Sequence, residues 1–383
     1  MEDKKVSTES VVFLLVFAGL ISVFAIPMGL MNAINTMINT AYSLLIDTVL
    51  YLTAMCVLMG AVSALLSEFG VIALLNKLLS PLMNPIYSLP GAASAGIVTT
   101  FLADNPAVLA LAEDKRFRCF FKKYQFPALT NLATSFGMGM VVCTYMLSLS
   151  TVTGCSYLCA TAVGFCGAVI GSVVSTRIMI RFTTKQFGKE SLYDPSDAEG
   201  SDAACAAYKQ KNNLGYRVLS SLLEGGKVGV KMGVDIIPGV LIICTFVLML
   251  TKGPGEMGTY TGAAYEGIAL LPQIAQYISP ILVPLFGFSS PEAISVPITA
   301  LGAAGASLSM TRQLLIDGKI GSGDIAVFTA MCMCWSGYLS THISMMDSLK
   351  CRELTGKAIV SHTVGGLCAG IVAHWIFVLV SLI

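Results

Sequence analysis

Charged residues are scarce in this sequence. Only 12% of its 383 residues are Asp, Glu, Lys or Arg, whereas a soluble globular domain carries about 25%. Hydrophobic residues make up 55% of the chain, an excess of apolar surface that favours lipid as the solvent. The formal net charge is only +1, so the strongly basic balance typical of nucleic-acid binding is absent. The expected partners are therefore a lipid bilayer and no nucleic acid.

Enzyme signatures and chelating cysteine pairs are also missing. The chain contains no H-E-x-x-H, G-x-S-x-G, P-loop or Rossmann glycine run, and we expect no enzymatic activity. Most of the twelve cysteines lie in apolar runs, where cysteine behaves as a small hydrophobe. Cys332 and Cys334 would lie about 200° apart around a helix, too far around to chelate one ion. We expect no metal site and no cofactor, with Na⁺ or H⁺ as the coupling ion of any transport.

Seven apolar runs approach the length of about 18 to 20 residues that crosses a hydrocarbon core. They lie at about 9–30, 43–66, 126–149, 155–180, 229–251, 325–346 and 358–383. None alternates as a barrel strand would, so helices are predicted, because lipid cannot satisfy free backbone groups. The first run resembles a secretory signal, and we interpret it as a retained helix. The predicted fold class is an all-α polytopic membrane protein.

The chain divides into two similar halves around one polar segment. The clearest match, at an offset of 199, pairs Ser80-Pro81-Leu82-Met83-Asn84-Pro85 with Ser279-Pro280-Ile281-Leu282-Val283-Pro284. The predicted domains are an N-terminal transmembrane helix with an outer loop (1–42), a first membrane repeat (43–183), a cytoplasmic linker (184–228) and a second membrane repeat (229–383).

Lys and Arg, which accumulate on the cytoplasmic side of membrane proteins, give the orientation. They crowd 115–123, the linker and 350–357, and they are absent or few in 31–42, 150–154, 252–264 and 312–324. Threading the chain through these sides inverts the second half relative to the first and places the amino terminus inside, in an inner (cytoplasmic) membrane. Inverted-topology repeats are typical of transporters.

Each half also holds an apolar segment, 69–111 or 263–311, that Pro and Gly interrupt. We predict a re-entrant helical hairpin in each, with tips at 87–91 and 287–292, although two full crossings would give the same topology. Backbone freed at such breaks is tolerated only where protein or a wet cavity meets it.

Acidic residues near these breaks are the first candidates for a binding site. Asp104 and Asn105 lie at a second break in the first hairpin, where a carboxylate costs about 2.5 to 3.5 kcal/mol to insert. Glu292 follows Pro291 at the second tip, beside Ser289 and Ser290. Both carboxylates could instead cap short helices, because an acidic first turn favours the helix dipole.

Polar residues inside the apolar runs complete the list. Asn131 lies on the helix at 126–149 and His342 on its counterpart. Isolated Ser and Thr usually bond their own backbone, so only these two stand out. We expect His362 and His374, on the last helix, to face neighbours or an interface.

The broken hairpins, with Ala-Asp-Asn-Pro-Ala (103–107) and Ser-Ser-Pro-Glu-Ala-Ile-Ser (289–295), resemble the nucleoside-recognition or Gate domain family. That family includes spore maturation proteins A and B, and its domain is also found in concentrative nucleoside transporters and the ferrous iron permease. Ser290-Pro291-Glu292-Ala293 is similar to the Thr-Glu-Ala-Pro hairpin tip that contacts the sugar in nucleoside transporters, except that Pro here precedes Glu. The resemblance implies a transporter, with cation coupling in several members.

We therefore predict an alternating-access carrier for a small polar solute, nucleoside-like or another organic molecule. Asp104 would be its central carboxylate, Glu292 the partner on the other hairpin, and Asn105, Asn131, Ser289 and Ser290 the neutral hydrogen-bonding groups. Two alternatives remain: an iron-like divalent-metal permease, and a structural or regulatory membrane partner. A homo-oligomer is compatible with each.

Overall fold

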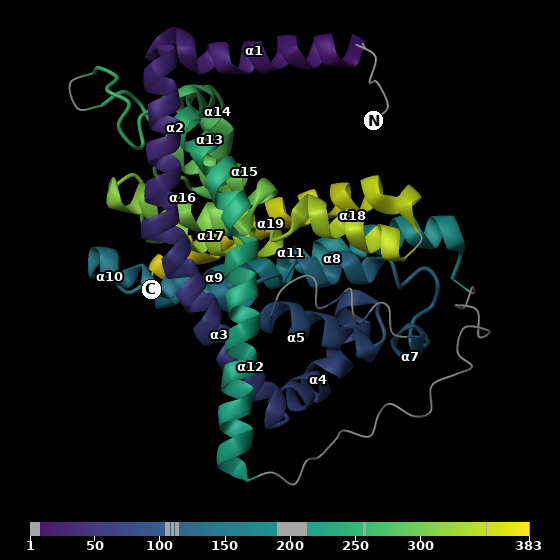
Figure 1. The fold of residues 1–383 in the computed structure, drawn as a ribbon. Helices are drawn as coiled ribbons and strands as arrows, with labels where there is room; N and C mark the ends of the chain where they lie inside the picture. The colour runs from purple at the N-terminus through teal and green to yellow at the C-terminus, as the bar shows by residue number, and fades with distance from the viewer. Residues whose placement is uncertain are drawn as a thin grey trace, which may run out of the picture.

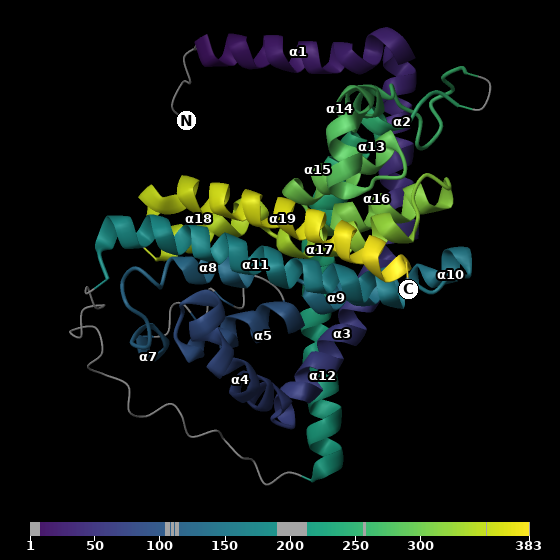
Figure 2. The same ribbon diagram turned by 180° about the vertical axis from the view of Figure 1, so that it is seen from behind.

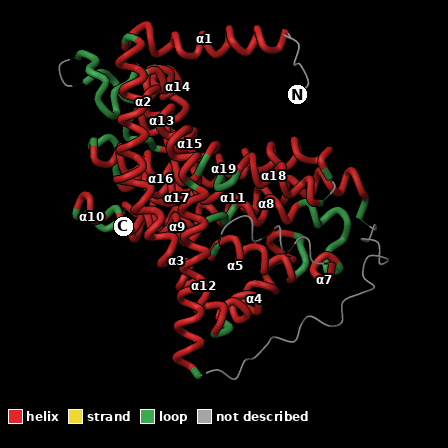
Figure 3. Tube along the Cα trace, in the orientation of Figure 1, coloured by secondary structure: helices red, strands yellow, loops and turns green. Residues whose placement is uncertain are grey.

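The computed structural model describes residues 8–103, 108, 111, 115–189, 213–255, 258–349 and 351–382. Within these ranges the chain is helical and has no strand (Figure 3), which confirms the all-α membrane class. Six helices are long and apolar enough to cross a membrane, and one bent pair would make a seventh span. The six are Thr8–Met28, Leu30–Glu68, Ala128–Thr153, Leu158–Phe187, Leu214–Thr251 and Arg352–Ser381.

A long helix follows the first apolar helix, α1 (Thr8–Met28), after a single glycine. It comprises α2 (Leu30–Leu44), the π-helical turn η1 (Leu45–Val49) and α3 (Leu50–Glu68). The outer loop predicted at 31–42 is therefore wrong. Its Asn and Thr residues lower the hydropathy, yet they lie on a helix and bond to a facing loop. Asn32 Nδ2 donates to the Tyr260 carbonyl at 3.0 Å, and Asn39 Nδ2 donates to that of Gly262 at 2.8 Å.

Glu266 joins this facing loop, which contains Tyr260 and Gly262, to α2 through hydrogen bonds. The residue is only 4% exposed, and its carboxylate accepts hydrogen bonds from the Thr261 hydroxyl at 2.7 Å, the Gly262 amide at 3.0 Å and the Thr36 hydroxyl at 3.4 Å. Burial by itself raises the pKa of the Glu266 carboxyl, but these hydrogen bonds together hold that pKa below its ordinary value. The ionised form therefore stabilises the loop.

Replacing Glu266 should reveal this contribution as a pH dependence. Because the folded pKa is depressed, the stabilisation is present above the unfolded value of about 4.3 and is lost as the pH falls through the folded value. We expect Glu266→Gln to lower the free energy of unfolding by about 2 kcal/mol at neutral pH. It should also flatten the acid limb of thermal unfolding curves in detergent. The exposed Glu224 provides the control, and equal pH profiles for wild type and Glu266→Gln would refute the assignment.

A second long helix begins earlier than predicted. It comprises α12 (Leu214–Asp235), the π-helical η5 (Gly239–Cys244) and α13 (Thr245–Thr251). Residues 214–228 are thus helix, and assigning them to the linker is wrong, because the charges and glycines of that stretch mask its helical periodicity. α12 packs backbone to backbone against α3, since a Cβ on Gly225 would lie 2.3 Å from the Gly60 carbonyl oxygen.

The remaining elements occur in the same order in both halves. The first half has α4 (Val71–Leu82) with η2 (Met83–Tyr87), η3 (Gly91–Ala93) with α5 (Ser94–Leu102), α7 (Lys115–Arg118), α8 (Ala128–Thr134), α9 (Gly139–Ser148), α10 (Ser150–Thr153) and α11 (Leu158–Phe187). The second has α14 (Leu270–Phe286), η6 (Pro291–Ile294) with α15 (Ser295–Gly302), α16 (Ala304–Ile316), α17 (Ser322–Cys334), α18 (Tyr338–Ser348), η7 (Arg352–Leu354) and α19 (Thr355–Ser381). The 199-residue offset carries the bounds of α4 with η2 onto those of α14.

α11 and α19 form the centre of the packed body and run in opposite directions (Figures 1 and 2), as inverted halves require. They touch through glycines: a Cβ on Gly171 would lie 2.5 Å from the Gly365 carbonyl oxygen. The elements near the Lys- and Arg-rich segments, α7, the end of α11 and the start of α19, lie at one end of this body. α10 and the end of α19 lie at the opposite end.

Candidate functional site

The second half contains a re-entrant hairpin formed by α15 and α16. At its start, Glu292 forms an ion pair of 2.9 Å with Lys319, which follows its end. The neighbouring Ser289 donates its amide (3.1 Å) and hydroxyl (2.6 Å) to Asp324, at the start of α17. The chain therefore enters and leaves at the same end, and it turns at Ala303, the single residue between the two helices.

The turn of this hairpin packs against the second long helix. Cβ atoms built on Gly239 and Gly302 would lie 2.7 Å from the Ala303 Cβ and 2.8 Å from Ile243 Cδ1. A Cβ on Gly305 would meet Ile236 at 2.1 Å. Only small residues fit at this turn, so the hairpin lies directly on the segment where the long helix widens into η5.

Both hairpin tips were predicted at the Pro- and Gly-rich breaks. The second break does bend the chain, by 76° between α14 and the helix Pro291–Gly302, but the α15–α16 hairpin turns at Ala303. The 287–290 break lies where the hairpin starts, beside Lys319 and Asp324. The 88–90 break lies beside the basic loop of the first half, where Gln125 Nε2 donates to the Ser88 carbonyl at 2.9 Å. The breaks instead end two helices, α4 and α14, that lie on the surface with few buried residues. The actual turn at Ala303 uses small residues without proline.

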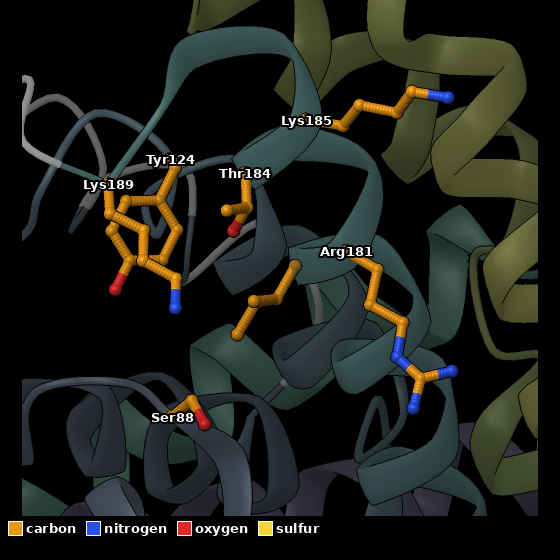
Figure 4. Close-up of a pocket in the computed structure, with 7 residues that line it drawn as sticks. Ser88, Tyr124, Arg181, Thr184, Lys185 and Lys189 are labelled. Atoms are coloured by element: carbon orange, nitrogen blue, oxygen red, sulfur yellow. The ribbon is translucent and has the colours of Figure 1, made fainter.

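Figure 4 shows the hollow beside the first break, with a volume of about 440 Å³. Ser88 lies on one side of the hollow. Thr184, the Tyr124 ring and the Lys189 ammonium lie on the opposite side. A smaller hollow of about 120 Å³ is lined by Ser289 and Ser290 with residues of α14. A surface hollow therefore lies beside each of the two breaks.

Two further helices are broken where sequence analysis predicted continuous spans. The predicted span 126–149 is divided into α8 and α9 by a turn at 135–138, in which Met138 has φ +51°. Its counterpart 325–346 is divided into α17 and α18 at 335–337, in which Gly337 has φ +66°. Each break interrupts the helical hydrogen-bond ladder and leaves two half-helix ends with free backbone groups.

The broken helices meet the hairpins near the centre of the molecule. The Phe101 ring, at the end of α5, lies over Gly139, where α9 begins. In the second half, the Ser307 hydroxyl of α16 lies 3.1 Å from Cys332 Sγ of α17. In both ribbon views, α9, α15, α16 and α17 cluster where the long helices cross the body (Figures 1 and 2).

A buried polar cluster joins α8, α11, α18 and α19 beside these breaks. Asn131 Nδ2 donates to Ser175 Oγ at 3.0 Å and to the Ala358 carbonyl at 2.9 Å. Ser175 Oγ lies 3.0 Å from Nδ1 of His362. The His362 ring packs on that of His342, with centroids 4.6 Å apart. Asn131, Ser175 and both histidines are fully buried.

The predicted site residues therefore separate into two groups. Asn131 and His342 belong to the buried cluster, whereas Ser289, Ser290 and Glu292 lie where the second hairpin begins. His374 lies against Gly287 at that end, and the twelve residues from His362 to His374 on α19 correspond to about 18 Å along the helix. Asp104 and Asn105 lie outside the described residues.

Sequence reasoning missed three members of these groups. Asp324 lies in the segment 312–324, which sequence analysis used only to assign the orientation. Ser175 is one of many membrane serines, and His362 was expected to face a neighbour or an interface. The signal for His362 was a second histidine on an apolar helix, which becomes informative only once α18 and α19 are known to pack together.

Metal ligands do not gather in the part of the chain that the structure describes. No three His, Cys, Asp or Glu side chains lie close enough there to hold an ion.

The ion pair with Glu292 raises the pKa of the Lys319 ammonium, so this pair stays charged at physiological pH.

No family model matches the chain, and no curated protein matches its sequence. Solved structures do match. A structure of CNTnw, a concentrative nucleoside transporter, in an inward-facing substrate-bound state aligns with a TM-score of 0.53 at 14% identity, over 85% of this chain and 74% of that one. Two substituted forms of CNTnw in outward-facing states align with TM-scores of 0.53 and 0.51, at 12% and 13% identity, each over 96% of this chain and 84% of theirs.

This likeness is one of fold. The chain is a multi-pass membrane protein with the architecture of a concentrative nucleoside transporter, so that part of the sequence resemblance is confirmed. Membership of the Gate family or of the spore maturation proteins has no support from a family model.

Proposed function

We propose that this protein is a secondary-active transporter that moves a small polar solute by alternating access. The observation that carries this proposal is the meeting of a re-entrant hairpin with two helices that are broken at equivalent positions of inverted halves. Half-helix ends in a membrane offer dipoles and free carbonyls to solutes and ions. The fold shared with a transporter solved in inward- and outward-facing states supports the proposal.

The moving parts follow from the packing. The two long helices contact each other through glycine backbones and form a rigid pair. The hairpins, the broken helices, α11 and α19 form the second body. The Ala303 turn lies between the two, on η5. Displacing this second body along the long helices would open the central breaks first to one side of the membrane and then to the other.

The solute would bind among the breaks at 135–138 and 335–337 and the hairpin turns. Asp104 and Asn105 follow α5 in the chain, and we retain Asp104 as the carboxylate that binds the solute or a coupling ion. Glu292, Ser289 and Ser290 are better placed to control access at the outer end, where Glu292 pairs with Lys319. A nucleoside-like solute is one candidate, because the matched transporter has this substrate class.

The orientation also belongs to this proposal. The segments rich in Lys and Arg gather at one end of the body, which we assign to the cytoplasmic side of an inner membrane, with the amino terminus inside. A divalent-metal permease is the weaker alternative, because no ligand cluster occurs among the described residues. A purely structural partner would not need a carboxylate such as Asp104 within an apolar segment.

Ligand-dependent thermal stability of the purified protein in detergent tests the proposal. The candidates are nucleosides, amino acids, Na⁺, Fe²⁺ and Zn²⁺. A specific ligand at about 100 times its dissociation constant should stabilise the fold by about 2.7 kcal/mol. We expect an organic solute to raise the melting temperature of wild type and not of Asp104→Asn. A shift with metals alone would favour the permease, and no shift in either protein would favour the structural partner.

A further inference from the structure

A further inference starts from a pair of buried imidazole rings, His342 on α18 and His362 on α19. This pair lies apart from the two surface hollows. Both side chains are fully buried and their rings lie 4.6 Å apart. The Tyr338 ring packs on both, at 6.2 Å from His342 and 6.1 Å from His362, and Trp335 packs on Tyr338. Burial disfavours the charged form of such rings, and histidines within a membrane protein are candidates for proton and ion pathways.

The hydrogen bonds fix which ring nitrogens carry hydrogen. A carbonyl can only accept, so Nε2 of His362, which bonds the Cys334 carbonyl, must be protonated, as must Nδ1 of His342, which bonds the Tyr338 carbonyl. Nδ1 of His362 then accepts from the Ser175 hydroxyl, which in turn accepts from the Asn131 amide. In the neutral pair, only Nε2 of His342 remains with a lone pair and no partner among the described residues.

The cluster holds two buried acceptors without a partner. Besides Nε2 of His342, Oδ1 of Asn131 has no partner in the described part of the chain. An unpaired acceptor is unfavourable in a buried site. A lone pair that no other group uses leaves Nε2 of His342 free to bind a proton. The Cys334 carbonyl is also the last of α17, and the negative end of a helix dipole favours an imidazolium.

Among the described residues of the neighbouring helices, no charged side chain is available to repel this proton or to take its place in the cluster. α8 and α15 have no ionisable side chain. Arg177 of α11 is bound to the carbonyls of Pro85 and Ile86, and Lys357 of α19 to Gln186. Arg181 and Lys185 of α11 line the hollow beside the first break, Asp324 is bound by Ser289, and Asp347 is paired with Arg352. The neighbouring thiol is Cys334, and it is buried.

We propose that His342 and His362 form a proton-binding site that couples transport to H⁺, with the proton taken up at Nε2 of His342. The inference rests on the proposed function. The site adjoins the 335–337 break. Binding a proton from one side of the membrane and releasing it to the other would therefore change the hydrogen bonding of the helix ends that the solute contacts. No bond is broken other than that of the transferred proton. Imidazole nitrogens favour H⁺ over Na⁺, which prefers oxygen ligands.

Two measurements on the full-length protein test the inference. In ¹⁵N-histidine NMR between about pH 8 and about pH 5, we expect the buried pair to take up one proton. His342→Gln should abolish that uptake, while His374→Gln, at the other end of α19, should preserve it. In Na⁺-free proteoliposomes, with radiolabelled uridine and an amino-acid mixture as probes, a gradient of about one pH unit should support about tenfold accumulation at one proton per solute. His342→Gln should reduce this to exchange without accumulation.

The outcomes separate the two proposals. Histidines 342 and 362 that stay neutral down to about pH 5 would overturn the proton site. Coupling to H⁺ would be overturned if solute exchange depended neither on the pH gradient nor on His342, or if accumulation depended on Na⁺ alone. In both cases the protein would still be a transporter. If no probe is exchanged at all, the proposed function fails for those solutes, and the NMR titration still decides the proton site. His362→Gln, whose amide can still donate to the Cys334 carbonyl, serves as a second variant if His342→Gln folds poorly.

Discussion

Gly229→Ala is expected to destabilise the protein by about 3 kcal/mol or more, the largest effect of a single methyl group anywhere on the long helices. A Cβ at this position would lie 2.2 Å from the Cys56 carbonyl oxygen and 2.5 Å from Val57 Cα. These are backbone atoms, so α12 and α3 would have to separate along their contact. The gain in helix propensity from Gly to Ala, about 1 kcal/mol, acts in the opposite direction and cannot offset this separation.

Gly226→Ala is the matched control. It lies on the same helix with the same gain in propensity, but its Cβ would meet only Val57 Cγ1 at an ordinary 3.6 Å. We expect its melting temperature in detergent to equal or exceed that of wild type. Equal melting temperatures for Gly226→Ala and Gly229→Ala would show that the two long helices are not packed through their backbones.

Joining the hairpin turn to the long helix should abolish transport. Gly239 and Ala303 face each other closely enough, with 2.7 Å between a built Cβ and the Ala303 Cβ, for the pair Gly239→Cys and Ala303→Cys to form a disulfide after a small shift. In a background lacking the other reactive cysteines, oxidation should reduce solute uptake at least about tenfold, because the second body can no longer move along the helix pair. Reduction should restore the uptake.

A second disulfide provides the control for this experiment. Ser307→Cys would pair with the native Cys332, whose Sγ lies 3.1 Å from the present hydroxyl. This bond joins α16 to α17 within one body, so uptake should survive its oxidation. If both disulfides stop uptake, or neither does, the proposed movement between the two bodies is wrong.

The membrane class and the order of elements could be predicted because both depend on long apolar runs and on a repeat visible in Ser80, Pro81 and Pro85. The breaks at 135–138 and 335–337 could not, because they contain glycine but no proline and stay within apolar sequence. Residues 214–228 were misassigned for the opposite reason. Their charges suggest a linker, while their glycines, such as Gly225, pack against the backbone of α3.

The candidate site, too, was predictable only in part. Asn131 and His342 were identified because each is strongly polar on an apolar helix, and that signal is local. Ser175, the partner of Asn131, is 44 residues away, and it bonds His362, which is 187 residues further on. Only tertiary packing selects these two partners from many similar residues. Glu292 illustrates the reverse case, because its local pattern suggested a central tip, and an ion pair with Lys319 places it at an end.

The number of crossings in each half also explains why the halves are inverted. Among the described residues each half has, in the same order, a long helix, a broken helix and a final helix, and the α15–α16 hairpin returns to the end where it started. Each half would therefore cross the membrane three times. Three is odd, so a half must finish on the side opposite to its start. When such a unit is duplicated and joined directly to its copy, the copy necessarily begins on the far side and is threaded upside down. The odd number of crossings is then enough to account for the antiparallel arrangement of α11 and α19.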